Sequence, residues 1–210
     1  MIPHNDPSVF DTRAAGYDTW FDKHFNLFQN ELSALRKAIP GNATGIDIGA
    51  GTGRFTQALG ISMAAEPSPA MAQIAIAKGI TVVKANAEEL PFHDRSFDFA
   101  LMVTVDCFLS DISQSFREAR RVLKNNGFFI LGMIDKGSEL GISYDAQKAT
   151  NPWYKDARFH AVQEITGFLQ QAGFTKFEYW QTIFSSNEEL TEPRPGYGTG
   201  SFVVIRSQKI

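Results

Sequence analysis

The sequence predicts an α/β fold in which a doubly wound, mostly parallel sheet carries helices on both faces. A short apolar run at residues 45–48 leads directly into a glycine-rich turn and a helix-like segment, which is typical of the first unit of such a sheet. Further apolar runs alternate with amphipathic stretches along the chain. The last two strand-like runs, 176–184 and 202–207, are joined without a helix, and this predicts an antiparallel final strand.

The glycine-rich turn at residues 49–53 predicts a site for a nucleotide-sized ligand. Gly49, Gly51 and Gly53 let the backbone pass where a Cβ atom would clash, and the following helix offers N–H groups to an electron-rich ligand. A nicotinamide fingerprint needs its third glycine where this chain has Arg54, and the lysine of a phosphate-binding loop is missing. A tight strand-to-helix turn that binds nothing is the alternative.

Polar residues also follow the second strand-like run. This run, 61–65, ends at Glu66, and Ser68 or Pro69 can begin the helix that comes next. An acid at the carboxyl end of such a strand can accept hydrogen bonds from both hydroxyls of a ribose, although a solvated loop acid is the alternative. The third and fourth strands are expected at residues 81–85 and 97–103.

The remaining elements continue the alternation of strands and helices. A helix is expected at 113–123, with Ser113 as a candidate cap. A turn at 124–127 then leads to an apolar strand at 128–134, and a second amphipathic helix follows at 162–172. Two regions lie outside the sheet and can reach its carboxyl edge: 8–38, which is interpreted as two helices, and 136–160.

The composition is that of one globular domain, residues 1–210. The 210 residues are 43% hydrophobic and 20% charged, which is enough for one well-buried core. A formal net charge of −3 provides no basic stripe for a nucleic-acid partner. The first ten residues lack a basic start and no apolar run approaches the roughly 18 residues of a membrane span, so we expect a cytoplasmic protein. The oligomeric state is left open.

The cysteine and histidine content argues against a disulfide or a metal site. Cys107 is the only cysteine in the sequence, so no intrachain disulfide, zinc cluster or iron–sulfur cluster with three cysteine ligands can form. The four histidines have no pair at the spacing of helical metal ligands. We therefore expect a protein that uses no metal.

Three motifs carry a family resemblance. The chain contains D-I-G-A-G-T-G at 47–53, E-P-S-P-A-M at 66–71 and N-A-E-E-L-P-F-H-D-R-S-F-D at 86–98. In this order and at these spacings, the motifs resemble the class I methyltransferases that use S-adenosylmethionine, in particular the ubiquinone and menaquinone biosynthesis type (methyltransferase type 11). The match covers residues 43–135, the expected cofactor-binding core. The resemblance implies a Rossmann-like sheet of seven strands, with S-adenosylmethionine as the cofactor and S-adenosylhomocysteine as its product.

The resemblance also implies individual cofactor contacts. Asp47 and Gly49 would hold the methionine end, and Glu66 would bind the ribose hydroxyls. Asn86 stands where the family usually has Asp, and its amide oxygen can still accept a hydrogen bond from the adenine amino group. The implied cofactor-binding residues are Tyr17, Asp47, Gly49, Ala50, Gly51, Glu66, Pro67, Met71, Asn86, Ala87, Glu88 and Val103.

Two flanking regions are expected to enclose the site. By resemblance, residues 8–38 form a helical lid in which Tyr17 shields the transferred methyl group from water. Residues 136–160 are expected to cap the substrate, because this aromatic-rich segment follows the fifth strand. Residues 161–210 complete the domain with a helix and a strand pair.

The expected function is methyl transfer to a small, partly apolar molecule by direct in-line displacement. A sulfonium carries its own charge and leaving group, so placement and exclusion of water are the main requirements and a catalytic base is optional. Asp106, Tyr144 and His160 are the candidates for such a base. The alternatives are a domain that binds the cofactor or its product without turnover, and a nicotinamide-dependent oxidoreductase on the same sheet. The acceptor atom is not predicted.

Overall fold

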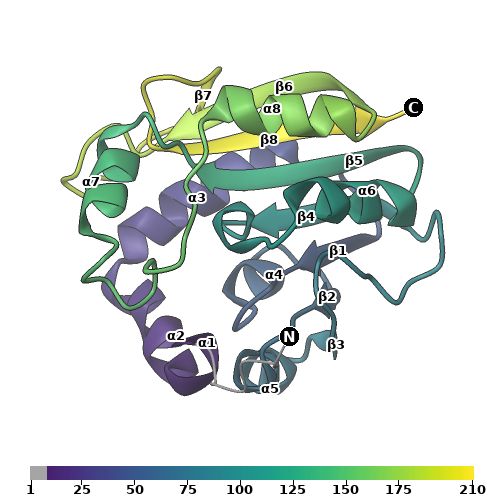
Figure 1. The fold of residues 1–210 in the computed structure, drawn as a ribbon, viewed down its shortest axis with the longest axis horizontal. Coiled ribbons are helices and arrows are strands. Elements are labelled where there is room, and N and C mark those ends of the chain that lie inside the picture. The colour runs from purple at the N-terminus through teal and green to yellow at the C-terminus, as the bar shows by residue number, and fades with distance from the viewer. Residues whose placement is uncertain (1–8) are drawn as a thin grey trace.

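The computed structural model describes residues 9–210, which form one mixed sheet with helices on both faces (Figure 1). The strand order is β3-β2-β1-β4-β5-β8-β6-β7. Strands β1 to β5 run parallel, whereas β8 is antiparallel to both of its neighbours, β5 and β6. The predicted α/β class and the antiparallel last strand are therefore confirmed. The strands are β1 (Gly45–Ile48), β2 (Met63–Ala65), β3 (Thr81–Val83), β4 (Phe97–Val103), β5 (Leu123–Ile134), β6 (Phe174–Thr182), β7 (Arg194–Pro195) and β8 (Phe202–Lys209).

The helices form the two outer layers. Figure 1 shows α6 and α8 in front of the sheet and α3 behind it. A single turn of 3-10 helix, Asp106–Phe108, follows β4. The α-helices are α1 (Val9–Thr12), α2 (Ala14–Lys23), α3 (Phe25–Ala38), α4 (Arg54–Ala58), α5 (Pro69–Ala77), α6 (Ile112–Val122), α7 (Glu139–Gln147) and α8 (Val162–Gln171).

The central strand β4 shows how the core divides into two. Successive side chains of a strand point to opposite faces, and in β4 both faces are covered by helices. Phe99, Leu101 and Val103 join the cluster formed with α2, α3 and α4. Ala100 and Met102 join the cluster formed with α6 and α8. The continuous apolar sequence of this strand therefore follows from burial on both sides.

Capping side chains begin three of these helices, α5, α6 and α7, and the cap of α7 is Ser138. The Ser68 hydroxyl accepts a hydrogen bond from the backbone N–H of Met71 at 3.3 Å, and Pro69 occupies the first turn of α5, as predicted. Helix α6 departs from the prediction, because its cap is Asp111 and not Ser113. The Asp111 carboxylate accepts from the N–H of Gln114 at 2.9 Å, so the helix begins at Ile112.

Two predicted counts are wrong. The sheet has eight strands and not seven, because Arg194–Pro195 in the polar segment before β8 pairs with the edge of β6 as β7. The N-terminal region contains three helices and not two, because the chain leaves helical geometry at Arg13 and again at His24. Residue 8, where the predicted lid begins, lies outside the described residues.

Helix α3 belongs to the core of the domain. It packs against β5, β6 and β8 and buries an apolar stripe that runs from Leu27 to Ala38. The side chain of Asn30 donates to the carbonyl of Glu189 and accepts from the N–H of Thr191, both at 2.8 Å. Any lid formed by the N-terminal region is therefore restricted to α1 and α2. Within residues 9–210, no helix has both the length and the apolarity needed to cross a membrane.

The close packing of Gly45 in β1 against Phe99 in β4 leads to a prediction about stability. A Cβ atom at Gly45 would lie 2.1 Å from Cζ of Phe99, whose ring is only 3% exposed. We expect Gly45→Ala to lower the free energy of unfolding by about 1–3 kcal/mol, because the enclosed ring has no space to move. Chemical denaturation measures this change. Gly41→Ala is the control, since a Cβ there meets nothing within 4 Å. Equal stability of the two variants would contradict the prediction.

Candidate active site

A cavity of about 720 Å³ lies at the carboxyl ends of the parallel strands. Its wall includes residues that follow β1, β2, β3 and β4, and it is completed by α1, α2, α3 and the segment after β5. Open α/β sheets bind ligands at this edge, where the strand order reverses, here between β1 and β4. The volume falls within the ~300–1,000 Å³ of small-molecule sites.

The glycine turn forms the floor of the cavity. Gly49, Gly51 and Gly53 have φ angles of +75°, +56° and +78°, a conformation that favours glycine. Packing also requires two of them, because a Cβ would lie 2.6 Å from Val105 at Gly49 and 2.4 Å from Ile80 at Gly53. At Gly51 the nearest atom to an added Cβ would be Cε1 of Tyr17 at 3.6 Å. Gly51 therefore lines the cavity beneath the ring of Tyr17.

Glu66 connects the glycine turn to the start of α5. Its oxygen Oε2 accepts a hydrogen bond from the N–H of Gly51, and Oε1 accepts from the N–H of Ser68, both at 2.8 Å. The side chain is 6% exposed and lines the cavity, so Glu66 is not a solvated loop acid. Burial raises the pKa of Glu66, although the two backbone N–H groups oppose this shift. A carboxylate oxygen that accepts one hydrogen bond can accept a second, here from a ligand hydroxyl.

Most of the predicted cofactor residues line the cavity, but Asp47 and Ala50 do not. Asp47 is 2% exposed and its Oδ2 accepts from the Thr56 hydroxyl at 2.6 Å, so it links β1 to α4 beneath the turn. Burial raises the pKa of Asp47 to about 7. Its contact with a ligand stays a prediction. The predicted residues in the wall are Tyr17, Gly49, Gly51, Glu66, Pro67, Met71, Asn86, Ala87, Glu88 and Val103.

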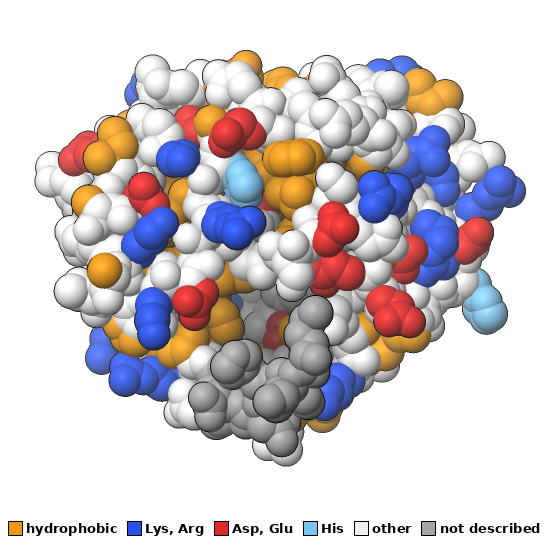
Figure 2. All heavy atoms as spheres, in the orientation of Figure 1, with side chains coloured by type: hydrophobic (Ala, Val, Ile, Leu, Met, Phe, Trp, Pro, Cys, Tyr) orange, Lys and Arg blue, Asp and Glu red, His pale blue; other side chains and the backbone are white. Residues whose placement is uncertain are grey.

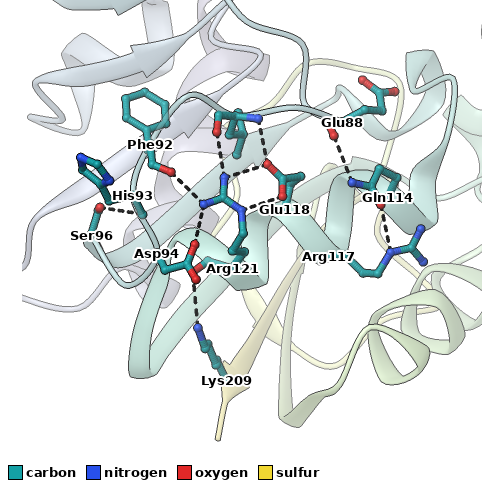
Figure 3. A network of polar contacts seen from close by, with 11 residues as sticks. Glu88, Phe92, His93, Asp94, Ser96, Gln114, Arg117, Glu118, Arg121 and Lys209 are labelled. Carbon is teal, nitrogen blue, oxygen red and sulfur yellow. Dashed lines mark hydrogen bonds and ion pairs between the residues drawn. The ribbon is translucent and has the colours of Figure 1, made fainter.

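The segment 86–88 lies after β3 and is held at Glu88 by residues at and just before the start of α6. The side-chain carboxylate of Glu88 accepts a hydrogen bond from the N–H of Ser110 at 2.9 Å. The backbone carbonyl of Glu88 accepts one from the side-chain amide of Gln114 at 3.2 Å. These bonds fix the backbone groups of this segment at the cavity wall. Figure 3 shows Gln114 reaching Glu88 from α6.

Arg121 of α6 fixes the rest of the loop that follows this segment (Figure 3). Its guanidinium donates to the carbonyls of Leu90 and Phe92 at 2.8 Å each. It also forms ion pairs with Glu118 at 2.7 Å and Asp94 at 2.8 Å. Because all these partners lie on one loop and one helix, Arg121 acts as a structural clamp for the adjoining cavity wall.

A second cavity of about 470 Å³ lies at the amino ends of the parallel strands. Figure 2 shows Lys and Arg side chains gathered on this side of the molecule, with Asp and Glu among them. The basic residues of its wall are Arg95, Arg117, Arg120, Arg121 and Lys209. Several of these charges already have partners in the fold, as Arg121 illustrates. The cavity at the carboxyl edge is the better candidate for the active site.

Helix α2 is tied to the glycine turn by charge. Arg54, which follows Gly53, donates to Asp18 at 2.9 Å and to Asp22 at 2.8 Å. Lys78, the C-cap residue of α5, also pairs with Asp18 and donates to the carbonyl of Thr52 at 2.8 Å. The residue that replaces the third glycine of a nicotinamide fingerprint therefore anchors α2 over the turn.

Aromatic side chains form the part of the wall that covers the glycine turn. Tyr17 packs edge-on against Phe21, with ring centroids 5.2 Å apart, and it contacts Trp153 at 5.5 Å. Phe10 contacts Phe108 at 5.1 Å and also reaches Trp153. The N-terminal helices and the 136–160 segment therefore meet over the cavity.

The three candidate bases lie in different surroundings. Tyr144 on α7 lines the cavity, and burial raises the pKa of its hydroxyl to about 12. Asp106 is 4% exposed, lies outside the cavity wall, and has a pKa raised by burial to about 7. His160 also lies outside the wall, and burial lowers its pKa. Of the three, the structure brings only Tyr144 to the cavity.

Glu31 is a cavity residue that the sequence reasoning missed. It is 7% exposed, and it interrupts the buried stripe of α3 between Leu27 and Leu35. Burial raises its pKa from 4.5 to about 8. The sequence does carry a signal for Glu31. It is an acid at a helical position where the spacing of the neighbouring apolar residues predicts an apolar one.

The described residues contain no group of three or more His, Cys, Asp or Glu placed to hold a metal ion. The polar side chains of the cavity wall are instead carboxylates, amides and hydroxyls.

Comparisons with known proteins agree with this site. A sequence model of the family described as "Methyltransferase domain" matches residues 46–131. A Methanocaldococcus jannaschii protein without an assigned function is 40% identical over 97% of this chain and 100% of its own length. A malonyl-[acyl-carrier protein] O-methyltransferase of Geobacter sulfurreducens is 30% identical over 89% of this chain and 74% of its own. The crystal structure of a Thermotoga maritima S-adenosylmethionine-dependent methyltransferase, described as a possible histamine N-methyltransferase, is also similar. Its TM-score is 0.93 and its sequence identity is 42%, and the match covers 96% of this chain and 99% of the Thermotoga chain.

The chain therefore belongs to the S-adenosylmethionine-dependent methyltransferases. The predicted family, enzyme class and cofactor are confirmed. The cavity fits this cofactor, because Gly51 and Glu66 line its wall and both Glu66 oxygens are oriented by N–H groups. The matched range includes the glycine turn, Glu66 and Asn86, whereas Tyr17, Glu31 and Tyr144 lie outside it.

The raised pKa of Glu31 predicts a pH-dependent effect on stability. Between pH 4.5 and about 8, the folded protein keeps a proton that the unfolded chain releases, so this group lowers stability as the pH rises. We expect the melting-temperature difference between Glu31→Gln and wild type to increase from about pH 5 to about pH 8.5. Thermal unfolding at both pH values measures it. Glu188→Gln, at a partly exposed acid, is the control, and a constant difference for Glu31→Gln would contradict the prediction.

Proposed function

We propose that this enzyme transfers the methyl group of S-adenosylmethionine to a small, partly apolar molecule, and that it does so without a metal. The observation that carries the proposal is the continuity of one cavity. Glu66 and the glycine turn line it together with the aromatic side chains Tyr17, Trp153 and Tyr144. The cofactor and a small acceptor can therefore occupy the same enclosed space.

Each cavity element has a proposed role toward the cofactor. Glu66 accepts hydrogen bonds from the two ribose hydroxyls, while Gly51 allows close approach of the ligand. Asn86 accepts from the adenine amino group, and the backbone of Ala87 and Glu88 borders the same ring. The bonds that fix Glu66 and Glu88 in place support these roles, because a preorganised acceptor loses little conformational entropy on binding.

The chemistry requires placement and dryness more than a dedicated base. When bound, the cofactor supplies an activated methyl group on a positively charged sulfur, which is its own leaving group. The aromatic wall excludes water and provides ring faces near that positive charge, a contact worth about 0.5–2 kcal/mol. Orientation of the acceptor can contribute several of the ~7–11 kcal/mol available from proximity. In-line displacement is therefore the mechanism that this cavity supports.

The proposed role of Glu66 predicts a binding defect. The purified protein should bind S-adenosylhomocysteine without added metal, and Glu66→Ala should weaken this binding roughly tenfold or more, because it removes charge-assisted hydrogen bonds to ribose. Isothermal calorimetry measures both affinities, and circular dichroism checks the fold. Glu89→Ala, at an exposed acid of the neighbouring loop, is the matched control. Tighter binding of NADH than of S-adenosylhomocysteine would refute the cofactor role, and an unchanged affinity would remove Glu66 from the site.

We also propose that α1 and α2 form a lid over the cavity, with Tyr17 above Gly51. Hydrogen exchange across residues 9–23 should slow when S-adenosylhomocysteine is added, whereas exchange in α8, on the opposite face, should not change. Tyr17→Phe should weaken ligand binding without lowering the melting temperature of the free protein, because the variant keeps the ring contacts with Phe21 and Trp153. Equal exchange with and without ligand would show that α2 is ordinary packing.

A further inference from the structure

Glu31 is an unpartnered acid in the wall of the cavity. Its side chain is buried to more than nine-tenths, and no hydrogen bond or ion pair within residues 9–210 involves its carboxylate. A buried carboxylate without a partner is costly, so such groups normally pair with a donor or a cation. The fold of the described residues provides none, and the carboxylate faces a ligand cavity.

The other acids of the cavity wall differ from Glu31 in this respect. Glu66 accepts from two backbone N–H groups, Glu88 accepts from Ser110, and Asp11 accepts from the Ser68 hydroxyl. No Lys, Arg or His belongs to the cavity wall formed by the described residues. The wall is therefore electronegative, and Glu31 is the acid in it whose hydrogen-bonding capacity is unused.

Aromatic rings line the cavity together with Glu31. Tyr17, Trp20 and Phe21 come from α2, and Tyr144 and Tyr154 come from the segment after β5. Tyr144 and Tyr154 stack with their centroids 4.8 Å apart, and Tyr154 also contacts Phe159. Ring faces attract cations, and a carboxylate among them is the arrangement that recognises an ammonium group.

We propose that the methyl acceptor is an amine, bound as a cation by the Glu31 carboxylate and the surrounding aromatic rings. This inference rests on the proposed methyl transfer and names its substrate class. The acceptor carries a protonatable nitrogen beside an apolar or aromatic body, since the side chains that line the cavity together with Glu31 are largely aromatic.

The position of Glu31 separates it from the cofactor segments. The glycine turn, Glu66 and Asn86 follow β1, β2 and β3, on one side of the point where the strand order reverses. Glu31 belongs to α3, which packs against β5, β6 and β8 on the other side. The carboxylate is therefore placed toward the acceptor end of the cavity and away from the adenosyl end.

Glu31 can also accept the proton that the amine must lose before its nitrogen is methylated. A protonated amine has no free lone pair, so its nitrogen first loses one proton to the carboxylate. The lone pair then forms the new N–C bond while the C–S bond of the cofactor breaks, and the electron pair of that bond stays on sulfur. The products are a methylated ammonium and neutral S-adenosylhomocysteine, and the protonated Glu31 releases its proton to solvent. In the empty cavity burial favours the protonated form of Glu31. An ammonium group beside it favours the charged form, so Glu31 ionises when the cation binds and is then a stronger base than an exposed carboxylate.

The test compares three matched probes that differ in charge. Phenethylamine, 2-phenylethanol and 3-phenylpropanoate present a cation, a neutral group and an anion on similar bodies. Their affinities for the protein saturated with S-adenosylhomocysteine are measured by ligand-observed NMR or calorimetry, for wild type, Glu31→Gln and the control Glu188→Gln. The control removes a negative charge that is paired with His24 outside the cavity wall. Circular dichroism and the affinity for S-adenosylhomocysteine report whether each variant is folded.

We expect wild type and Glu188→Gln to prefer phenethylamine over both other probes by roughly tenfold or more, as charge-assisted contacts imply. In Glu31→Gln this preference should disappear while the affinity for S-adenosylhomocysteine changes less than about twofold. Equal binding of the three probes to wild type, or a preference that survives Glu31→Gln, would overturn the amine proposal. A parallel loss of S-adenosylhomocysteine affinity would also overturn it, because the charge would then serve the cofactor. Failure of wild type to bind S-adenosylhomocysteine would instead refute the proposed function itself.

Discussion

The carboxylate of Glu66 is the contact on which the geometry of the site depends. It accepts from the N–H of Gly51 and from the N–H of Ser68, so one side chain fixes the turn after β1 relative to the turn after β2. Parallel strands bring these turns to the same edge. An acid buried there would be costly without hydrogen-bond donors, and the two N–H groups supply them. Because both oxygens are already oriented, the part of the wall that we propose to bind the ribose is formed before any ligand arrives.

Charge also joins the N-terminal helices to this edge. Arg54 begins α4 immediately after the glycine turn, and it pairs with Asp18 and Asp22 on α2. Lys78 reaches Asp18 from the C-cap of α5, so three helices meet at one carboxylate. These ion pairs are partly exposed, and each contributes modestly to stability. Their main consequence is positional, since they hold Tyr17 above the backbone of Gly51.

The parts of the site that could be predicted from the sequence are those encoded locally. One short segment contains the end of β1, three glycines and the start of α4, and Glu66 directly follows β2. The positions of the glycine turn and of Glu66 can therefore be predicted from the local sequence. Glu31 and β7 depend on distant contacts instead. Glu31 reaches the cavity because α3 packs against β5, β6 and β8, and β7 forms because Arg194–Pro195 meets the edge of β6. Asp106 was a reasonable candidate base from its place after β4, but the turn of 3-10 helix places it outside the cavity wall.

The electrostatics of the cavity impose an order on the reaction that we propose. A sulfonium and an ammonium are like charges, and their mutual repulsion grows as water is excluded. An acid-lined wall without cations, as the described residues provide, offsets this repulsion while both ligands bind. Transfer then requires that the amine lose its charge before the nitrogen attacks. A carboxylate that is buried beside the acceptor, and whose pKa is raised, serves both needs, because it attracts the cation and then removes the proton. An active site that binds a sulfonium and an ammonium together needs such a carboxylate beside the acceptor. Because Glu31 has no partner within the described residues, it is free for this proposed role.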